Sequence, residues 1–212
     1  MSPLDRQPEP EFWAAREERF CKGDQSAKKA LHGGQHEHRS LAEWFHEKVR
    51  PDGAALLCAY CDGGLEETSP KTIDHFIPEH ADRSLGLAWT NLYPACVCCN
   101  STFKGTRWSC KLVRPDRDPV EQWFVFDLDT GRVNPAPELD RRTRARVRLT
   151  IGVFQLNAAG RCMARKRIWR AMENAAKHPQ DSASLEDYAA RGPYRFVAAL
   201  YLSTREGPVA AS

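Results

Sequence analysis

Two pairs of cysteines most constrain how this chain can fold. Cys58 and Cys61 form the first pair, and Cys96 and Cys99 form the second. In each pair two residues separate the cysteines, so both thiolates can reach one metal ion from a single tight turn. Two such turns complete the tetrahedral sulfur coordination of a structural zinc ion. The pairs lie 34 residues apart, whereas a simple zinc ribbon has about 15–20. The spacing predicts a zinc site with a sizeable insertion.

The remaining cysteines lack a partner at metal-binding spacing, and we expect them to be free thiols: Cys21, Cys98, Cys110 and Cys162. Cys98 lies inside the second pair, but using it together with the adjacent Cys99 would be strained. Ordinary buried thiols are one alternative to zinc, and a secreted disulfide protein is another. The first residues contain no apolar core of a signal peptide. We therefore expect a cytoplasmic protein with zinc-bound thiolates.

The insertion carries an ordered set of polar residues. Asp74 and His75 lie in a short apolar segment, Asn91 precedes the second cysteine pair, and Asn100 directly follows it. Over about residues 58–105 this pattern resembles the HNH (ββα-metal) endonucleases, in their zinc-stapled branch. The third signature position of that family is often histidine and is Asn100 here, a variant that the family also uses. The resemblance implies a zinc-stapled strand–strand–helix core.

The resemblance and the chemistry of phosphodiester hydrolysis imply the same roles. His75 can serve as general base, because an imidazole accepts protons near neutral pH. Asp74 and Asn100 offer hard oxygen ligands that suit a catalytic Mg²⁺ or Mn²⁺ ion, which would polarise the phosphate. Neighbouring strand residues point to opposite faces, so we expect a bent loop to bring Asp74 and His75 together. In the family, the residue matching Asn91 fixes that loop through backbone hydrogen bonds.

Asn100 is expected at the start of a helix, with Lys104 one turn later on the same face. Lys104 would then neutralise a neighbouring phosphate, although an exposed lysine early in a helix is common. His75 standing alone would more often be a structural histidine, but its position after Asp74 and inside the insertion favours catalysis. His80 is read as a plain loop histidine, with phosphate contact as the alternative.

Composition bounds the remaining possibilities. The 212 residues suit one compact domain with additions, or two small ones. The 42% hydrophobic and 28% charged content is typical of a globular protein in water. The longest apolar runs, near 54–60 and 196–202, are far shorter than the roughly 20 residues that cross a bilayer. We expect no membrane association.

Charge is distributed unevenly along the chain. The net charge is only +3, yet residues 141–170 contain nine arginines, one lysine and no acidic residue. Arginine suits phosphate recognition, so this stretch predicts a surface for nucleic acid, with Arg141, Arg144 and Arg148 as contacts. A solvated helix surface with side-chain stems packed on the core is the alternative.

The pattern of apolar residues predicts an α+β protein in which the zinc-stapled core is embedded in mainly helical surroundings. Residues 1–53 form an N-terminal helical segment, 54–118 the nuclease core, and 119–212 a β-hairpin with an arginine-rich helical region. We expect helices at 11–20, from Ser40, from about 139 to 154, at about 160–177, from Ser184 and at 194–202, and the hairpin at 123–133. Residues 28–38 contain three histidines and read as a polar loop rather than a metal site.

The outer pieces sharpen the resemblance to one subgroup, the HNH nucleases of Septu-type and retron-associated anti-phage systems. Those pieces are Trp89–Leu92, the hairpin, and an arginine-rich helix ending in Leu156 and Asn157. The resemblance implies an ABC/SMC-like ATPase as partner and DNA as substrate. Two alternatives stay open. One is an HNH nuclease of mobile-element, restriction or junction-resolving type, and the other is a non-catalytic zinc-dependent module that binds nucleic acid.

Overall fold

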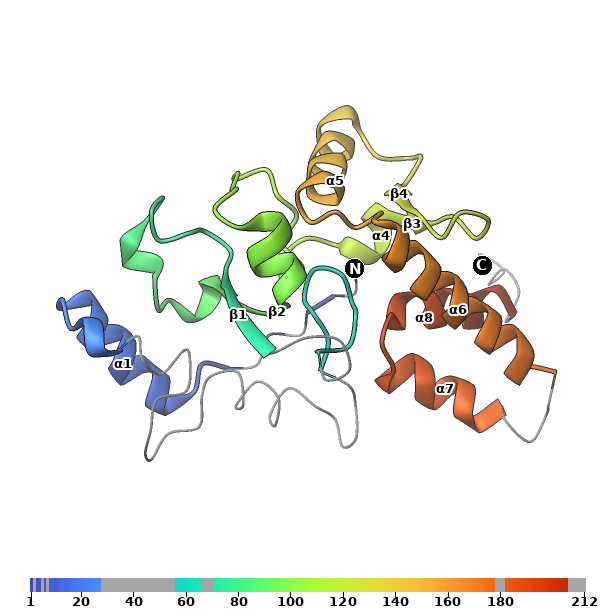
Figure 1. Cartoon of the computed structure of the whole chain (residues 1–212), viewed down its shortest axis with the longest axis horizontal. Helices are drawn as coiled ribbons and strands as arrows, with labels where there is room; N and C mark the ends of the chain where they lie inside the picture. The colour runs from blue at the N-terminus through green and yellow to red at the C-terminus, as the bar shows by residue number, and fades with distance from the viewer. Residues whose placement is uncertain are drawn as a thin grey trace, which may run out of the picture.

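The structure is a computed structural model that describes residues 1, 3, 4, 6, 8–27, 56–65, 71–177 and 182–205. Helices and two short antiparallel sheets alternate along these residues (Figure 1). The mixture of helix and strand agrees with the predicted α+β class. The predicted polar loop at 28–38 and the helix expected from Ser40 lie outside the described residues.

The centre of the fold is a hairpin followed by a helix. Strand β1 (Lys71–His75) pairs antiparallel with β2 (Leu92–Cys96), so that His75 lies opposite Leu92. Two short 3₁₀ turns, η2 (Arg83–Leu85) and η3 (Trp89–Asn91), occupy the connection. After β2 the chain forms η4 (Cys98–Lys104), a π-helical segment that packs on both strands. The order strand–strand–helix is the one predicted for the core.

The N-terminal helix α1 (Glu11–Cys21) covers one side of this centre. Trp13 and Phe20 are buried in a cluster with apolar side chains of the insertion, and the Trp13 indole N–H donates to the Leu87 carbonyl at 2.8 Å. The helix predicted at 11–20 is confirmed. Phe12, on the same helix, is 37% exposed.

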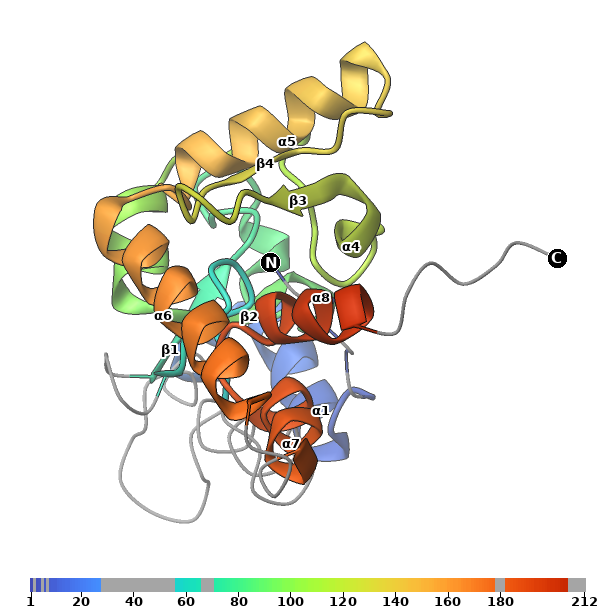
Figure 2. The ribbon, with the colours of Figure 1, turned by 90° about the vertical axis from the view of Figure 1, so that its right-hand side faces the viewer.

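A second hairpin follows the centre. Helix α4 (Val120–Trp123) leads into β3 (Phe124–Phe126), which pairs with β4 (Val133–Pro135). Asp140 caps the next helix, α5 (Arg141–Val153), by accepting from the N–H groups of Arg142 and Thr143. Helix α5 lies along β4 (Figure 2). The predicted hairpin and long helix are confirmed, with shorter strands than expected.

The last three helices form a cluster at the end of the molecule opposite α1 (Figure 1). They are α6 (Ala159–Ala175), α7 (Ser182–Arg191) and α8 (Arg195–Arg205). Their shared core contains Met172, Leu185, Ala198 and Tyr201, and the partly buried Ile168 and Trp169 pack against it. The predicted C-terminal helices are therefore confirmed.

Candidate active site and metal centre

The four predicted cysteines gather into one buried cluster. Their sulfur atoms all lie within 4.8 Å of one another, and Cys61 Sγ is 3.8 Å from Cys96 Sγ. Four sulfurs placed tetrahedrally at about 2.3 Å from zinc are separated by about 3.8 Å. The cluster therefore fits a structural zinc ion. Cys98 is exposed and lies outside it, which resolves the register of the second pair.

Each half of the cluster is shaped by its own backbone. At the first pair, the Asp62 N–H donates to the Cys58 carbonyl at 2.9 Å, and Asp62 has a left-handed φ of 64°. At the second pair, the Cys99 N–H points at Cys96 Sγ at 3.4 Å. An N–H group directed at a sulfur atom, as that of Cys99 is, stabilises the negative charge of the thiolate. Hydrogen bonds from the other thiols, Cys58 first, lower the pKa of Cys96 and favour its metal-binding form.

A guanidinium group from α6 contacts this cluster. Arg161 Nη2 lies 2.9 Å from Cys99 Sγ and 3.9 Å from Cys96 Sγ, and the residue is only 9% exposed. Burial works to lower the pKa of Arg161, but the adjacent thiolates, Cys61 first, raise it above its ordinary value. The sequence placed Arg161 in a run of surface cations. Together with the similarly buried Arg165, it instead points inward from α6.

Asp74 occupies a second buried centre. Its Oδ2 accepts from the Tyr60 hydroxyl at 2.5 Å, and its Oδ1 accepts from Lys104 Nζ at 2.9 Å. Lys104 also donates to the His75 carbonyl at 2.6 Å. Burial raises the pKa of Asp74, and the Lys104 ammonium and the Tyr60 hydroxyl offset only part of that rise. The carboxylate is thus held by an internal cation.

This arrangement corrects the expectation for Lys104. Its side chain is 1% exposed, so it does not present its ammonium group to a phosphate at the surface. The prediction placed Lys104 on the face of the helix that carries Asn100, where it would neutralise a phosphate. In the structure η4 packs on β1, and this packing turns Lys104 toward the Asp74 carboxylate. A divalent cation at Asp74 would compete with Lys104 for the same oxygens.

His75 lies at the end of β1 with its side chain 22% exposed. Its Nε2 is 2.7 Å from the Gly86 carbonyl, and Glu79 Oε1 is 3.6 Å away. A carbonyl only accepts hydrogen bonds, so Nε2 carries the proton and, in the neutral ring, Nδ1 keeps the lone pair. A half-exposed imidazole oriented in this way can accept a proton from water.

The side chains of Asp74 and His75 do not converge as expected. Strand β1 stays extended through both residues, which pair with Tyr93 and Leu92 of β2. Consecutive side chains of a strand point to opposite faces. Asp74 accordingly contacts Tyr60 and Lys104, whereas His75 contacts the Gly86 carbonyl. No bend brings the two together in the described part of β1.

Asn91 fixes the loop after β1, as the resemblance implies. Its Oδ1 accepts from the Ile77 N–H at 2.8 Å, and its Nδ2 donates to the carbonyls of Ile77 and Leu85 at 3.0 Å each. The side chain is buried, so these hydrogen bonds are shielded from water. Asn91 therefore ties Ile77 to Leu85, the residue directly before Gly86, whose carbonyl is the partner of His75.

Asn100 connects η4 to β1. Its Nδ2 donates to Thr72 Oγ1 at 3.1 Å and to the Ile73 carbonyl at 3.2 Å. The expected start of a helix near Asn100 is present, since η4 begins at Cys98. The amide nitrogen is used by β1, so the carboxamide oxygen is the atom that could serve a cation.

The predicted nucleic-acid contacts Arg141, Arg144 and Arg148 lie on α5, outside the central hairpin. Arg141 and Arg148 are exposed. Arg144 is half-buried, and its Nη2 donates to the carbonyls of Pro137 and Leu139. These positions leave a cationic surface available on α5.

Sequence reasoning missed Tyr60. It stands between the first two cysteines, stacks on Phe154 with ring centroids 4.0 Å apart, and hydrogen-bonds Asp74. An aromatic residue inside a cysteine pair was the available signal, but its contacts come from segments far away in the sequence.

Comparison with known proteins adds one match. Residues 58–104 match the family model described as HNH endonuclease, and this segment contains the cysteine cluster, His75, Asn91 and Asn100. The match indicates a nuclease domain, a type of hydrolase. No curated protein matches the chain. Among the described helices, none combines the length and apolar character that crossing a membrane requires.

Proposed function

We propose that this protein is a metal-dependent endonuclease that hydrolyses phosphodiester bonds of DNA. The HNH endonuclease match over residues 58–104 supports the reaction class. The observation that carries the proposal within the site is the placement of His75. Its Nε2 is held by the Gly86 carbonyl, and its half-exposed ring leaves Nδ1 to accept a proton. A base oriented by a backbone carbonyl is what activation of a water molecule requires.

In this proposal the cysteine cluster holds zinc and has a structural role. The catalytic ion is Mg²⁺ or Mn²⁺, held by Asp74 and Asn100, and it supplies charge stabilisation to the reacting phosphate. Because Asp74 already pairs with Lys104, binding of that ion has to overcome an internal salt bridge. Asn91 keeps the segment that carries Gly86 in place, and so indirectly keeps His75 in orientation.

Plasmid cleavage tests the proposal. The parent protein is expected to convert supercoiled plasmid in the presence of Mg²⁺ or Mn²⁺, and His75→Ala is expected to lose this activity. His80→Ala is the matched control, because His80 is an exposed histidine in the segment that follows β1 and has no assigned role. Equal cleavage by the parent and by His75→Ala would overturn the mechanism.

A second arm of the same assay tests the metal requirement with a chelator. EDTA is expected to stop cleavage, and excess Mg²⁺ is expected to restore it. If only zinc restores cleavage, the ion that EDTA removed was the one among the thiolates. This result would contradict a requirement for Mg²⁺ or Mn²⁺.

A non-catalytic zinc module that binds nucleic acid is the second candidate. The specific observation in its favour is the Asp74 carboxylate, which is buried and already neutralised by Lys104. The simultaneous presence of Asp74, His75 and Asn100 favours catalysis. A parent protein that binds DNA but cuts it no faster than His75→Ala would establish the module instead.

We further propose that the nuclease belongs to a bacterial anti-phage defence system and acts in the cytoplasm with an ABC/SMC-like ATPase. Support comes from the resemblance of the outer segments to Septu-type and retron-associated nucleases, and from a thiol cluster suited to a reducing compartment. Affinity purification from the native host should recover an ATPase. Strong cleavage by the isolated protein, with no ATPase recovered, would favour a mobile-element, restriction or junction-resolving nuclease.

A further inference from the structure

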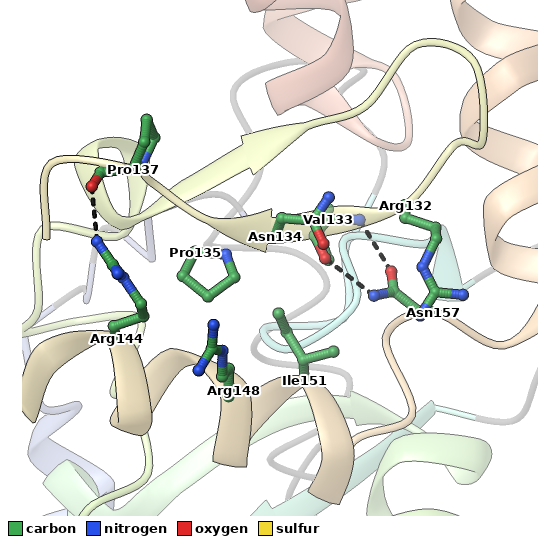
Figure 3. Close-up of a pocket in the computed structure, with 9 residues that line it drawn as sticks. All are labelled: Arg132, Val133, Asn134, Pro135, Pro137, Arg144, Arg148, Ile151 and Asn157. Carbon is green, nitrogen blue, oxygen red and sulfur yellow. Dashed lines mark hydrogen bonds between the residues drawn. The ribbon is translucent and has the colours of Figure 1, made fainter. Parts of the chain in front are cut away.

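A cavity of about 480 Å³ lies between β4 and α5 (Figure 3), and no residue of β1, β2 or η4 lines it. We call it the arginine groove. None of its lining residues is acidic, and three are arginines. The lining comprises Arg132, Val133, Asn134, Pro135, Pro137, Arg144, Arg148, Ile151 and Asn157. A cavity lined by cations without carboxylates points to an anionic ligand.

The arginines follow the groove in a row. Arg144 and Arg148 lie one turn apart on α5, which separates them by about 6 Å along the helix axis. Arg132 lies at the other end, beyond Ile151 and Asn157 (Figure 3). Three positive groups facing one cavity repel each other, so an anion that lies between them lowers the energy of all three. The row has the form expected for a ligand with successive negative charges.

The guanidinium groups retain capacity for such a ligand. Arg144 commits Nη2 to the carbonyls of Pro137 and Leu139, which fixes its position and leaves its other N–H groups. Arg132 and Arg148 are exposed, and neither side chain donates a hydrogen bond to any residue that the structure describes. Asp127 is an acidic group that interacts with Arg132. Its pKa is lowered by the Thr130 N–H first and to a smaller extent by Arg132.

The wall of the groove is firmly attached. Asn157 accepts from the Val133 N–H at 2.8 Å and donates to the Val133 carbonyl at 2.9 Å, so β4 is tied to the segment that follows α5. Pro135 and Ile151 supply an apolar floor between the arginines (Figure 3). A row of cations with apolar surface between them suits a chain of phosphates whose sugars pack on that surface.

We propose that the arginine groove binds the phosphodiester backbone of a nucleic-acid strand, with phosphates at Arg144–Arg148 and at Arg132. This inference rests on the proposed function and specifies where the substrate is held apart from His75. It adds Arg132, which lies outside the arginine-rich run of the sequence. It also separates Arg144 and Arg148 from Arg141, which is exposed at the start of α5 and does not line the groove.

The test is binding of a labelled DNA duplex by the full chain, measured by fluorescence anisotropy without added Mg²⁺ or Mn²⁺. The double variant Arg132→Ala, Arg148→Ala is expected to bind at least about tenfold more weakly. The slope of log affinity against log salt should fall by about 2, since each lost phosphate contact removes about 0.9. An unchanged far-ultraviolet spectrum and Tm would show that the variant is folded.

The matched control is Arg167→Ala, Arg170→Ala, which removes the same charge from exposed positions on α6 that do not line the groove. Its affinity is expected to stay within about twofold of the parent. Equal losses of DNA affinity in the two double variants would mean that net charge alone, rather than the groove, attracts the DNA, and would overturn the proposal. Unchanged binding by the groove variant would overturn it as well.

Two further arms separate this inference from its alternatives. The first arm adds either nucleoside triphosphate at micromolar concentration or unlabelled duplex with an equal concentration of phosphate groups. If only the nucleoside triphosphate displaces the labelled duplex, the groove is a nucleotide site, and the proposal that it binds a strand is wrong. His75→Ala should retain binding, so failure of the nuclease proposal and failure of the groove proposal give different results.

Discussion

The thiol cluster and the Asp74 centre are both buried anionic sites that receive a cation from a separate helix. Arg161 of α6 contacts the thiols, and Lys104 of η4 contacts Asp74. The difference lies in how completely each site is neutralised. Four sulfurs with one guanidinium leave negative charge for a metal ion, whereas one carboxylate with one ammonium is balanced. The first site is therefore prepared for its ion, and at the second an ion has to displace an existing partner.

The largest expected effect concerns the thiol cluster. Cys96→Ser should lose zinc and most of the ordered core, since structural zinc contributes about 10–16 kcal/mol of apparent binding energy in small zinc domains. Zinc content by mass spectrometry and Tm by circular dichroism measure the effect. Cys98→Ser is the control, because this neighbouring thiol is exposed. Equal zinc content in the two variants would break the comparison.

The next effect concerns the internal salt bridge. Lys104→Met should destabilise the protein by about 3–5 kcal/mol, because it leaves the Asp74 carboxylate buried without a cation. Urea denaturation measures the loss. Added Mg²⁺ should raise the stability of the variant more than that of the parent, since the ion no longer competes with the ammonium. No difference in the Mg²⁺ response would contradict competition at Asp74.

The same variant should show a defined pH dependence. Without Lys104, the pKa of Asp74 in the folded state rises further above its unfolded value, so the folded state binds the extra proton. Stability relative to the parent then falls as pH rises from the unfolded pKa through the folded pKa, and the deficit is complete above the latter. Acidification toward pH 4 should reduce the deficit. A deficit independent of pH would mean that lost packing, rather than charge, causes it.

A smaller effect is expected from Asn91→Ala, which touches neither anionic centre. Loss of its three hydrogen bonds leaves backbone groups of Ile77 and Leu85 without partners, at a cost of about 1–3 kcal/mol. Hydrogen exchange should increase between His75 and Asn91. Zinc content and the stabilisation by Mg²⁺ should stay as in the parent. A change in zinc content would show that the loop and the thiol cluster are coupled.

The last effect concerns Arg161→Met, which should weaken zinc binding by about 10–100-fold without preventing folding. Competition with a chromophoric chelator measures this affinity. Arg167→Met, on the exposed side of the same helix, is the control. If both variants bind zinc as the parent does, the guanidinium–thiolate contact has no energetic role.

How well the sequence predicted each part depends on whether the determinant is local. The cysteine cluster followed from spacing, because each pair is closed by a single turn. The loop-fixing role of Asn91 was implied by the resemblance to the HNH endonucleases. The contact of Asp74 with Lys104 could not be predicted from the sequence. The alternation of side chains along β1 predicts that Asp74 and His75 point to opposite faces. Which of the two contacts η4 depends on how η4 packs on the strand.

The arginine-rich run illustrates the same limit. Counting charge over residues 141–170 predicts a cationic surface, and Arg141 and Arg148 are exposed. Arg161 and Arg165 lie four residues apart on the inward side of α6, where they bind sulfur and backbone carbonyls. The sequence of a segment gives its number of charged residues but not the direction in which their side chains point. Arg132 lies outside that window and reaches the groove only because β4 runs beside α5.

The packing of α1 behind the loop has a consequence for truncated forms of the protein. Phe20 lies so close to Gly86 that a Cβ atom on that glycine would come within 2.7 Å of its ring. Gly86 in turn supplies the carbonyl that orients His75. Helix α1 therefore supports Gly86 and, through the Gly86 carbonyl, the orientation of the His75 ring. Under the proposed function, a shortened chain that lacks this helix is expected to retain zinc and DNA affinity, and yet to lose catalytic rate.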